Sequence, residues 1–150
     1  MTSDIIVGFP GETDADLRET IDLVQQCEYD SLYIFKYSKR SGTPAANFTD
    51  NVPEQEKKER FLELEATQRK TQDRIYQSYI GRTLQVLVER QSTRSENDLS
   101  GHSTCNKVVN FAGDRGLEGE IVDVTVTAAK TNSLYGAVAN SVRVNRSVVE

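Results

Sequence analysis

The turn Gly8–Thr13 (GFPGET) is the first of three segments whose residue types could bind a ligand. Its glycines would allow a ligand to approach the backbone, and the helix expected after it would present free N–H groups. The spacing matches neither the G-x-G-x-x-G fingerprint nor a P-loop, so no dinucleotide or ATP site is predicted. On residue types alone, an ordinary tight turn between a strand and a helix is the favoured alternative.

The second segment, Lys36–Pro44, holds three cations and several hydroxyl groups. Because it follows the second strand of a predicted parallel pair, it should lie at the same edge of the sheet as the first segment. Phosphate or carboxylate could bind there. A solvated basic loop explains the segment equally well.

The third segment, Gly101–Phe111, mixes hydrogen-bonding side chains with one cation, Lys107, and one aromatic ring, that of Phe111. Small barrels bind single-stranded RNA by stacking bases on aromatic rings and steering the backbone with cations. On residue types alone the alternative is favoured, in which Phe111 belongs to the core and the polar residues face water. The cations that could extend an RNA-binding face are Arg90, Arg94 and Lys130.

The sequence contains one histidine and two cysteines. His102 and Cys105 have no third or fourth ligand nearby, so no zinc site is predicted. Cys27 is most simply a small buried residue at a helix end, and a single histidine supports no nucleophilic catalytic set. Because the cysteines are distant and form no disulfide framework, we expect a reducing, cytoplasmic setting.

The elements that must position these segments begin with a strand at 4–7, a helix over about 13–27 and a strand at 31–37. This βαβ pattern predicts parallel strands. Two strands cannot cover both faces of a parallel sheet, so the unit needs more strands than the chain supplies. A polar loop and a long helix from Pro53 to about Tyr79 follow, with an apolar stripe (Phe61, Leu64, Ile75, Tyr79) and the i,i+4 pairs Glu54–Lys58, Glu56–Arg60 and Glu65–Arg69.

After Gly81 the pattern changes to short alternating strands at 83–89, 104–111, 122–126 and 133–138. Turn residues separate them, which favours a small antiparallel barrel. No periodic pattern continues beyond Asn140. The residues interpreted as turns are Gly101, Gly113, Asp114, Gly116, Gly119 and Asn132.

Hydrophobic residues make up 37% of the chain and charged residues 27%, with a net charge of −5, as in soluble globular proteins. No apolar run approaches the ~20 residues of a transmembrane helix, and no signal peptide is expected. The chain has 10 basic and 15 acidic residues through Ser78, but 8 of each from Tyr79 onward. Any nucleic-acid site must therefore be a local patch.

These segments together resemble a known family. The stretch at 4–13 (DIIVGFPGET), with Phe35–Ser38, Arg40 and Gly42–Ala45, is similar to the late strands of the radical-SAM barrel in methylthiotransferases. The stretches at 105–111 (CNKVVNF) and 130–136 (KTNSLYG) resemble the appended TRAM domain, and order and spacing agree over about 2–138. The likeness favours the MiaB branch, which acts on tRNA adenosine.

The resemblance implies an α/β plus all-β fold. The last βαβ part of a partial, TIM-like radical-SAM barrel would occupy 1–52, a linking helix 53–78, an OB-like antiparallel TRAM barrel 79–140 and a tail 141–150. A complete family enzyme carries S-adenosyl-L-methionine (SAM) and two 4Fe–4S clusters. It methylthiolates C2 of N6-isopentenyladenosine at position 37 of tRNA, and its partner is the anticodon stem-loop; no membrane is involved.

The resemblance also assigns residues by position. No catalytic residue or metal ligand is assigned. Those implied in cofactor binding are Ile6, Val7 and Gly8 at the SAM adenine pocket and Lys36 and Ser38 at the barrel mouth, and those implied in tRNA contact are Arg90, Asn106, Lys107, Lys130 and Asn132.

One departure from the family is decisive for the expected activity. The family barrel holds a cluster with a C-x3-C-x2-C motif, because thiolates bind the iron. Cys27 and Cys105 do not form this motif. We therefore expect a C-terminal portion that lacks the N-terminal cluster domain and most of the barrel, and that is inactive alone. The alternative is a TRAM-type RNA-binding module with no chemistry of its own.

Overall fold

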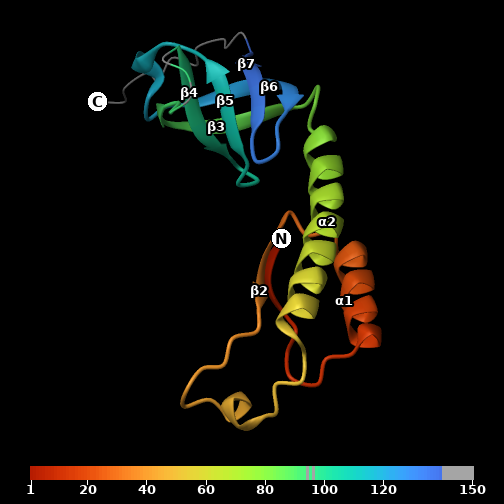
Figure 1. The fold of residues 1–150 in the computed structure, drawn as a ribbon. Helices are drawn as coiled ribbons and strands as arrows, with labels where there is room; N and C mark the ends of the chain where they lie inside the picture. The colour runs from red at the N-terminus through yellow and green to blue at the C-terminus, as the bar shows by residue number, and fades with distance from the viewer. Residues whose placement is uncertain (94, 96, 140–150) are drawn as a thin grey trace, which may run out of the picture. The chain divides into compact units, whose positions relative to one another are not determined.

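The computed structural model describes residues 1–93, 95 and 97–139 (Figure 1). The chain forms two compact units, one over Met1–Ile75 and one from Tyr76 onward. Arg94 and the tail predicted at 141–150 lie outside the described residues.

The first unit contains the predicted βαβ arrangement. Its elements are β1 (Thr2–Val7), α1 (Asp14–Cys27) and β2 (Ser31–Lys36). The strands are parallel, with Thr2 opposite Ser31 and Val7 opposite Lys36. Thr13 caps α1 in a reciprocal capping box with Asp16, which confirms the predicted helix start.

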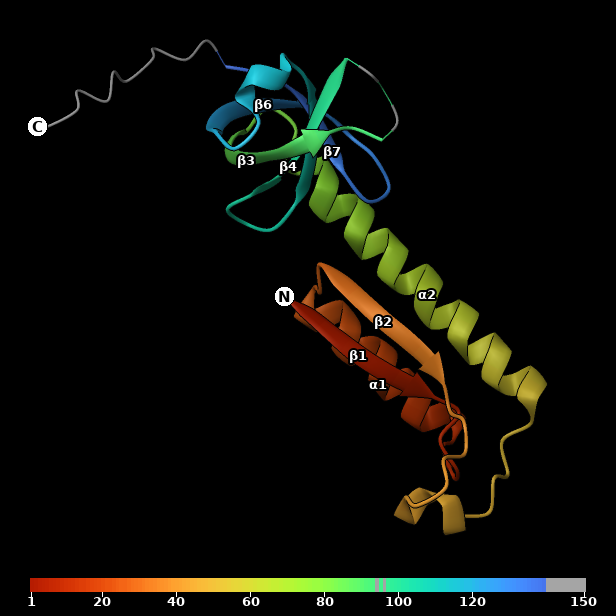
Figure 2. The same ribbon diagram turned by 90° about the vertical axis from the view of Figure 1, so that its left-hand side faces the viewer.

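Both helices of this unit lie on one side of the two-stranded sheet (Figure 2). A short 3-10 turn, η1 (Pro44–Asn47), precedes the second helix, α2 (Glu54–Gln77). Within the described residues of the first unit, no element covers the other side of the sheet: Ile6 is 54% exposed, Tyr33 60% and Phe35 53%. The core on the covered side consists of Val7, Leu17, Ile21, Val24 and Leu64.

The buried stripe of α2 is more polar than its sequence predicts. Leu64 is buried, but so are four polar residues of the helix, Lys57, Arg60, Gln68 and Thr71. The pairs Glu56–Arg60 and Glu65–Arg69 form as predicted, whereas Glu54 pairs with Lys36 of β2 instead of with Lys58. Glu54 pairs with Lys36 because β2 places this lysine next to the start of α2, and the spacing of residues in the sequence does not reveal that contact.

The second unit is a closed five-stranded barrel in the order β3-β4-β5-β7-β6. Its core is made of alternate strand residues, Val86 and Val88 on β3 among them, together with Tyr76. The strands are β3 (Thr83–Gln91), β4 (Asp98–Ser103), β5 (Val108–Ala112), β6 (Ile121–Ala129) and β7 (Leu134–Val138), with a 3-10 turn η2 (Arg115–Leu117).

Two details of the predicted barrel are wrong. The strand predicted at 104–111 begins only at Val108, as β5, because the residues before it form a turn. The strand β4, which contains Gly101, was not predicted, since Gly101 was interpreted as a turn residue. The barrel is also not fully antiparallel, because β5 and β7 pair in parallel. This strand position requires glycine, because a Cβ on residue 101 would stand 2.0 Å from the Leu87 carbonyl oxygen, where β3 and β4 approach closely.

Candidate functional site

The turn Gly8–Thr13 is held by side chains of α2. The Gly8 N–H donates to Glu12 Oε2, and Arg60 Nη1 donates to the same carboxylate at 2.7 Å and to the Glu12 carbonyl at 2.9 Å. A Cβ on Gly8 (φ +70°) would stand 2.3 Å from Cγ of Lys57. The space that Gly8 leaves open is therefore filled by the protein's own lysine.

Arg60 is the residue of this site that sequence reasoning missed. Its side chain is 4% exposed and also pairs with Asp14 at 3.2 Å and with Glu56. Burial lowers the pKa of Arg60, but the hydrogen bond to Glu12 and the neighbouring carboxylates outweigh it and raise the pKa. In the sequence, Arg60 looked like half of a surface ion pair, and the sequence has no signal that α2 would cross the turn.

The residues implied in SAM binding have different environments. Val7 and Gly8 are buried, whereas Ile6 is exposed on the bare sheet face. Lys36 and Ser38 are exposed, and Lys36 is ion-paired with Glu54. All five of these residues nevertheless lie at or just beyond the carboxyl ends of β1 and β2, where ligands of α/β folds bind.

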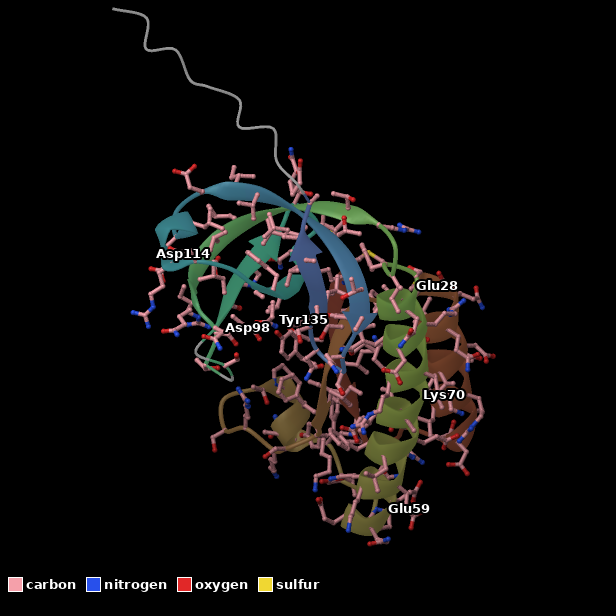
Figure 3. All side chains as sticks on the ribbon, turned by 90° about the horizontal axis from the view of Figure 1, so that it is seen from above. Glu28, Glu59, Lys70, Asp98, Asp114 and Tyr135 are labelled. Atoms are coloured by element: carbon pink, nitrogen blue, oxygen red, sulfur yellow. The ribbon has the colours of Figure 1, made fainter. Side chains whose placement is uncertain are left out.

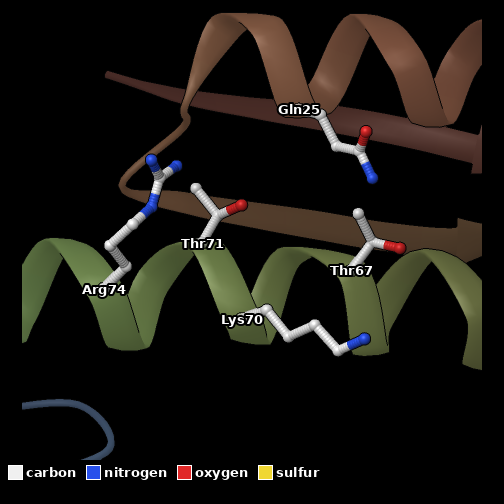
Figure 4. A pocket seen from close by; sticks show the side chains of 5 residues that line it. All are labelled: Gln25, Thr67, Lys70, Thr71 and Arg74. Carbon is white, nitrogen blue, oxygen red and sulfur yellow. The ribbon is translucent and has the colours of Figure 1, made fainter.

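A polar groove of about 430 Å³ runs along α2 on the side of α1 (Figure 4). Arg74 at one end is paired with Glu28 at 2.7 Å. The groove offers hydroxyl, amide and cationic groups, and sequence reasoning identified no site there. Its lining residues are Gln25, Thr67, Lys70, Thr71 and Arg74.

The residues implied in tRNA contact divide between the two ends of the barrel. Since β5 and β7 run parallel, the turns that lead into them lie at one end, and they carry Asn106, Lys107, Lys130 and Asn132. Arg90 is exposed near the other end of β3. Lys130, Asn106 and Asn132 are also exposed.

Lys107 differs from the other candidates because its side chain is buried. It is 4% exposed, and its ammonium lies 5.0 Å from the ring centroid of Tyr76 and 6.0 Å from that of Tyr79. Ser103 Oγ accepts the Lys107 N–H at 3.0 Å, which tightens the turn before β5. This geometry favours a cation–π contact inside the barrel unit over direct contact with a phosphate.

Phe111, the aromatic ring of the third segment, is fully buried in the barrel core, as its alternative interpretation predicted. Tyr135 of β7 is a half-buried aromatic residue instead, and its hydroxyl donates to Asp98 Oδ1 at 3.2 Å (Figure 3). Burial raises the pKa of Tyr135, and the hydrogen bond to Asp98 raises it further. His102 Nδ1 lies 2.9 Å from Glu89 Oε1.

The described residues do not fit an iron–sulfur cluster. Cys27 belongs to the first unit and Cys105 to the second. No group of three or more His, Cys, Asp or Glu side chains converges among residues 1–93, 95 and 97–139. No helix in the same residues is long and apolar enough to cross a membrane.

The barrel matches a known domain. Residues 77–139 match the TRAM domain, so the second unit is a TRAM barrel. Over 138 residues, the chain is 45% identical to the tRNA-2-methylthio-N(6)-dimethylallyladenosine synthase of Acetivibrio thermocellus and 46% identical to that of Alkaliphilus oremlandii. Each alignment covers 92% of this chain and 29% of the relative.

The synthase of Geobacillus thermodenitrificans is 45% identical over 140 residues, which cover 93% of this chain and 27% of that protein. The chain therefore spans less than a third of the length of these relatives, and it matches their C-terminal region. Over almost its whole length, the chain is thus similar to the C-terminal region of these tRNA-2-methylthio-N(6)-dimethylallyladenosine synthases.

Proposed function

We propose that this chain is the C-terminal portion of an enzyme that methylthiolates C2 of N6-isopentenyladenosine at position 37 of tRNA by radical-SAM chemistry. The observation that carries the proposal is about 45% identity, over 92% of the chain, to synthases whose name states this product. In this proposal the TRAM barrel holds the anticodon stem-loop of the tRNA.

The first unit would contribute the edge formed by the carboxyl ends of β1 and β2. SAM, when bound with the two 4Fe–4S clusters of a complete enzyme, supplies the radical and the methyl group. The exposed side chains at this edge, Ile6, Lys36 and Ser38, would border the SAM site. The hydrogen bonds from Arg60 to Glu12 would keep the turn after Val7 fixed. No chemical step is assigned to a residue of this chain.

Disruption of the gene tests the enzymatic proposal. Nucleosides from the tRNA of the disrupted strain are separated and identified by mass spectrometry. We expect the 2-methylthio derivative to disappear, N6-isopentenyladenosine to accumulate, and a plasmid copy of the gene to restore the product. Unchanged tRNA would overturn the enzymatic proposal.

The alternative is a TRAM-type RNA-binding module without chemistry. The match of residues 77–139 to the TRAM domain supports it. The module would bind RNA, but its disruption would leave the tRNA modification unchanged. The same mass spectra therefore separate the two functions.

A further inference from the structure

We propose that a single-stranded RNA segment runs from the end of β3 across the outer face of β4, β5 and β7, along a row formed by Arg90, Ser100, Asn110 and Tyr135. We call these four residues the cross-strand row. The inference rests on the proposed function, because it assumes that the barrel binds tRNA. It adds that the cross-strand row is the binding surface and that the bound part of the RNA is single-stranded.

The strand register places the four residues side by side. Arg90 is opposite Ser100, Ser100 is opposite Asn110, and Asn110 is opposite Tyr135. Neighbouring strands lie about 4.8 Å apart, so the row spans roughly 14 Å. Arg90 is itself exposed. Ser100, Asn110 and Tyr135 face outward because their neighbours along the strands are buried, namely Leu99, Gly101, Val109, Phe111, Leu134 and Gly136.

The order of chemical groups along the row suits a single strand. Arg90 offers a cation to a phosphate, which positions the backbone. The hydroxyl of Ser100 and the amide of Asn110 can bond a base edge or a 2′-hydroxyl, and the ring of Tyr135 can stack on a base. A duplex would not present unstacked bases to this ring.

Charge is arranged to support this path. The turn that holds the exposed Lys130 ends two residues before Tyr135, so a cation lies near each end of the row. Among the described residues of this face, the carboxylates of Glu89 and Asp98 have partners in the barrel: Glu89 contacts His102, and Asp98 accepts the Tyr135 hydroxyl.

The outer residues of the β3–β6 pair do not offer this chemistry. Thr83 is opposite Thr125, Gln85 is opposite Asp123, and Leu87 is opposite Ile121. These pairs contain neither a cation nor an aromatic ring. Within the described strands, the β4–β5–β7 face is therefore the better match for RNA.

The test measures fluorescence anisotropy of a labelled anticodon stem-loop RNA with the full chain at several salt concentrations. We expect Asn110→Ala and Tyr135→Leu to weaken binding at least about fivefold without changing the salt dependence. Arg90→Ala should weaken binding and lower the salt slope by about one unit. Tyr135→Phe keeps the ring and should bind within about twofold of wild type.

Two variants serve as matched controls. Gln85→Ala removes an exposed amide from the β3–β6 face, and Arg69→Ala removes an exposed cation from the first unit. Both should bind like wild type. Circular dichroism melting establishes that each variant is folded, and if Tyr135→Leu is not, Asn110→Ala and Arg90→Ala decide the question.

The outcomes separate this inference from the proposed function. If wild type binds the RNA and the cross-strand row variants bind equally well, the face is wrong and the RNA-binding function stands. If the row variants weaken a fully paired duplex as much as the stem-loop, the single-strand assignment is wrong. If wild type binds no RNA even at low salt, the RNA-binding function and this inference both fail.

Discussion

Every strand of the TRAM barrel pairs with two neighbours, whereas each strand of the first unit pairs with one. Closure removes the free strand edges of the barrel. The barrel core includes residues from the start of the second unit, such as Tyr76, and from near its end, such as Leu134. The first unit instead leaves Ile6, Tyr33 and Phe35 exposed on an uncovered face. A parallel sheet normally has both faces covered, so the first unit needs further structure and the barrel does not.

The two units also bury their cations differently. In the first unit, Arg60 is surrounded by carboxylates, and Lys57 contacts Asp50 at 2.7 Å. In the barrel, Lys107 lies over two tyrosine rings. Ion pairs fix the turn that faces a proposed ligand, whereas the cation–π contact fixes the end of a helix to a strand turn.

The largest expected effect follows from separating the units. We expect residues 76–139 expressed alone to give a dispersed proton NMR spectrum and a cooperative melt, because their core is complete. Residues 1–75 should give a poorly dispersed spectrum and no cooperative transition, because the sheet has a bare face. The full chain is the control. A cooperative melt from residues 1–75 would remove the contrast between the units.

A smaller but still large effect is expected from Gly101→Ala in the barrel. The new Cβ would stand 2.0 Å from the Leu87 carbonyl oxygen, and backbone cannot move aside as a side chain can. We expect a loss of about 3 kcal/mol in the free energy of unfolding, measured with urea. Gly116→Ala is the matched control, since its Cβ would meet only the Asp114 side chain, at 3.2 Å. Equal stability of the two variants would mean that β3 and β4 do not approach so closely.

Gly101 also shows what could not be predicted from the sequence. Glycine usually marks a turn, and only the proximity of β3 explains its place inside β4. The parallel β5–β7 pair was likewise hidden, because strand order depends on contacts between distant segments. In contrast, Thr13 with Asp16 three residues later is a local signal, and the start of α1 was predicted from it.

The candidate sites were predictable in residue type but not in burial. Lys107 and Lys130 look alike in the sequence, yet only Lys130 is exposed. The outward orientation of Tyr135 follows from its position between Leu134 and Gly136, which face inward. Its proximity to Asn110 required the strand register.

Lys107 gives an intermediate effect that sharpens the contrast in buried cations. Lys107→Ala removes the buried stem and the cation–π contact, so we expect a loss of about 2 kcal/mol in urea denaturation. Lys107→Met keeps most of the stem and should lose about half as much. Lys130→Ala, at an exposed lysine, should stay within about 0.5 kcal/mol of wild type.

The same variants test whether Lys107 contacts RNA. A buried ammonium should leave the salt slope of RNA binding unchanged when it is removed. If Lys107→Ala kept wild-type stability but lowered the salt slope by about one unit, its side chain would reach a phosphate. The cation–π assignment would then be wrong.

The smallest expected effect concerns Tyr135 and alkaline pH. Burial and the hydrogen bond to Asp98 raise the pKa of Tyr135 above its usual value of 10.0 in the folded barrel. The unfolded chain therefore releases this proton at lower pH than the folded chain does. The stabilising contribution is complete below pH 10.0 and is lost as the pH rises through the folded pKa.

Tyr135→Phe has no proton to release and should lack this part of the pH dependence. Urea denaturation of wild type and Tyr135→Phe at about pH 9 and about pH 11 measures the difference, since the other titrating groups are common to both proteins. We expect the stability of wild type to fall more than that of Tyr135→Phe. Equal losses would show that the Tyr135 hydroxyl titrates alike in the folded and unfolded chains, and that its contact with Asp98 does not hold the proton.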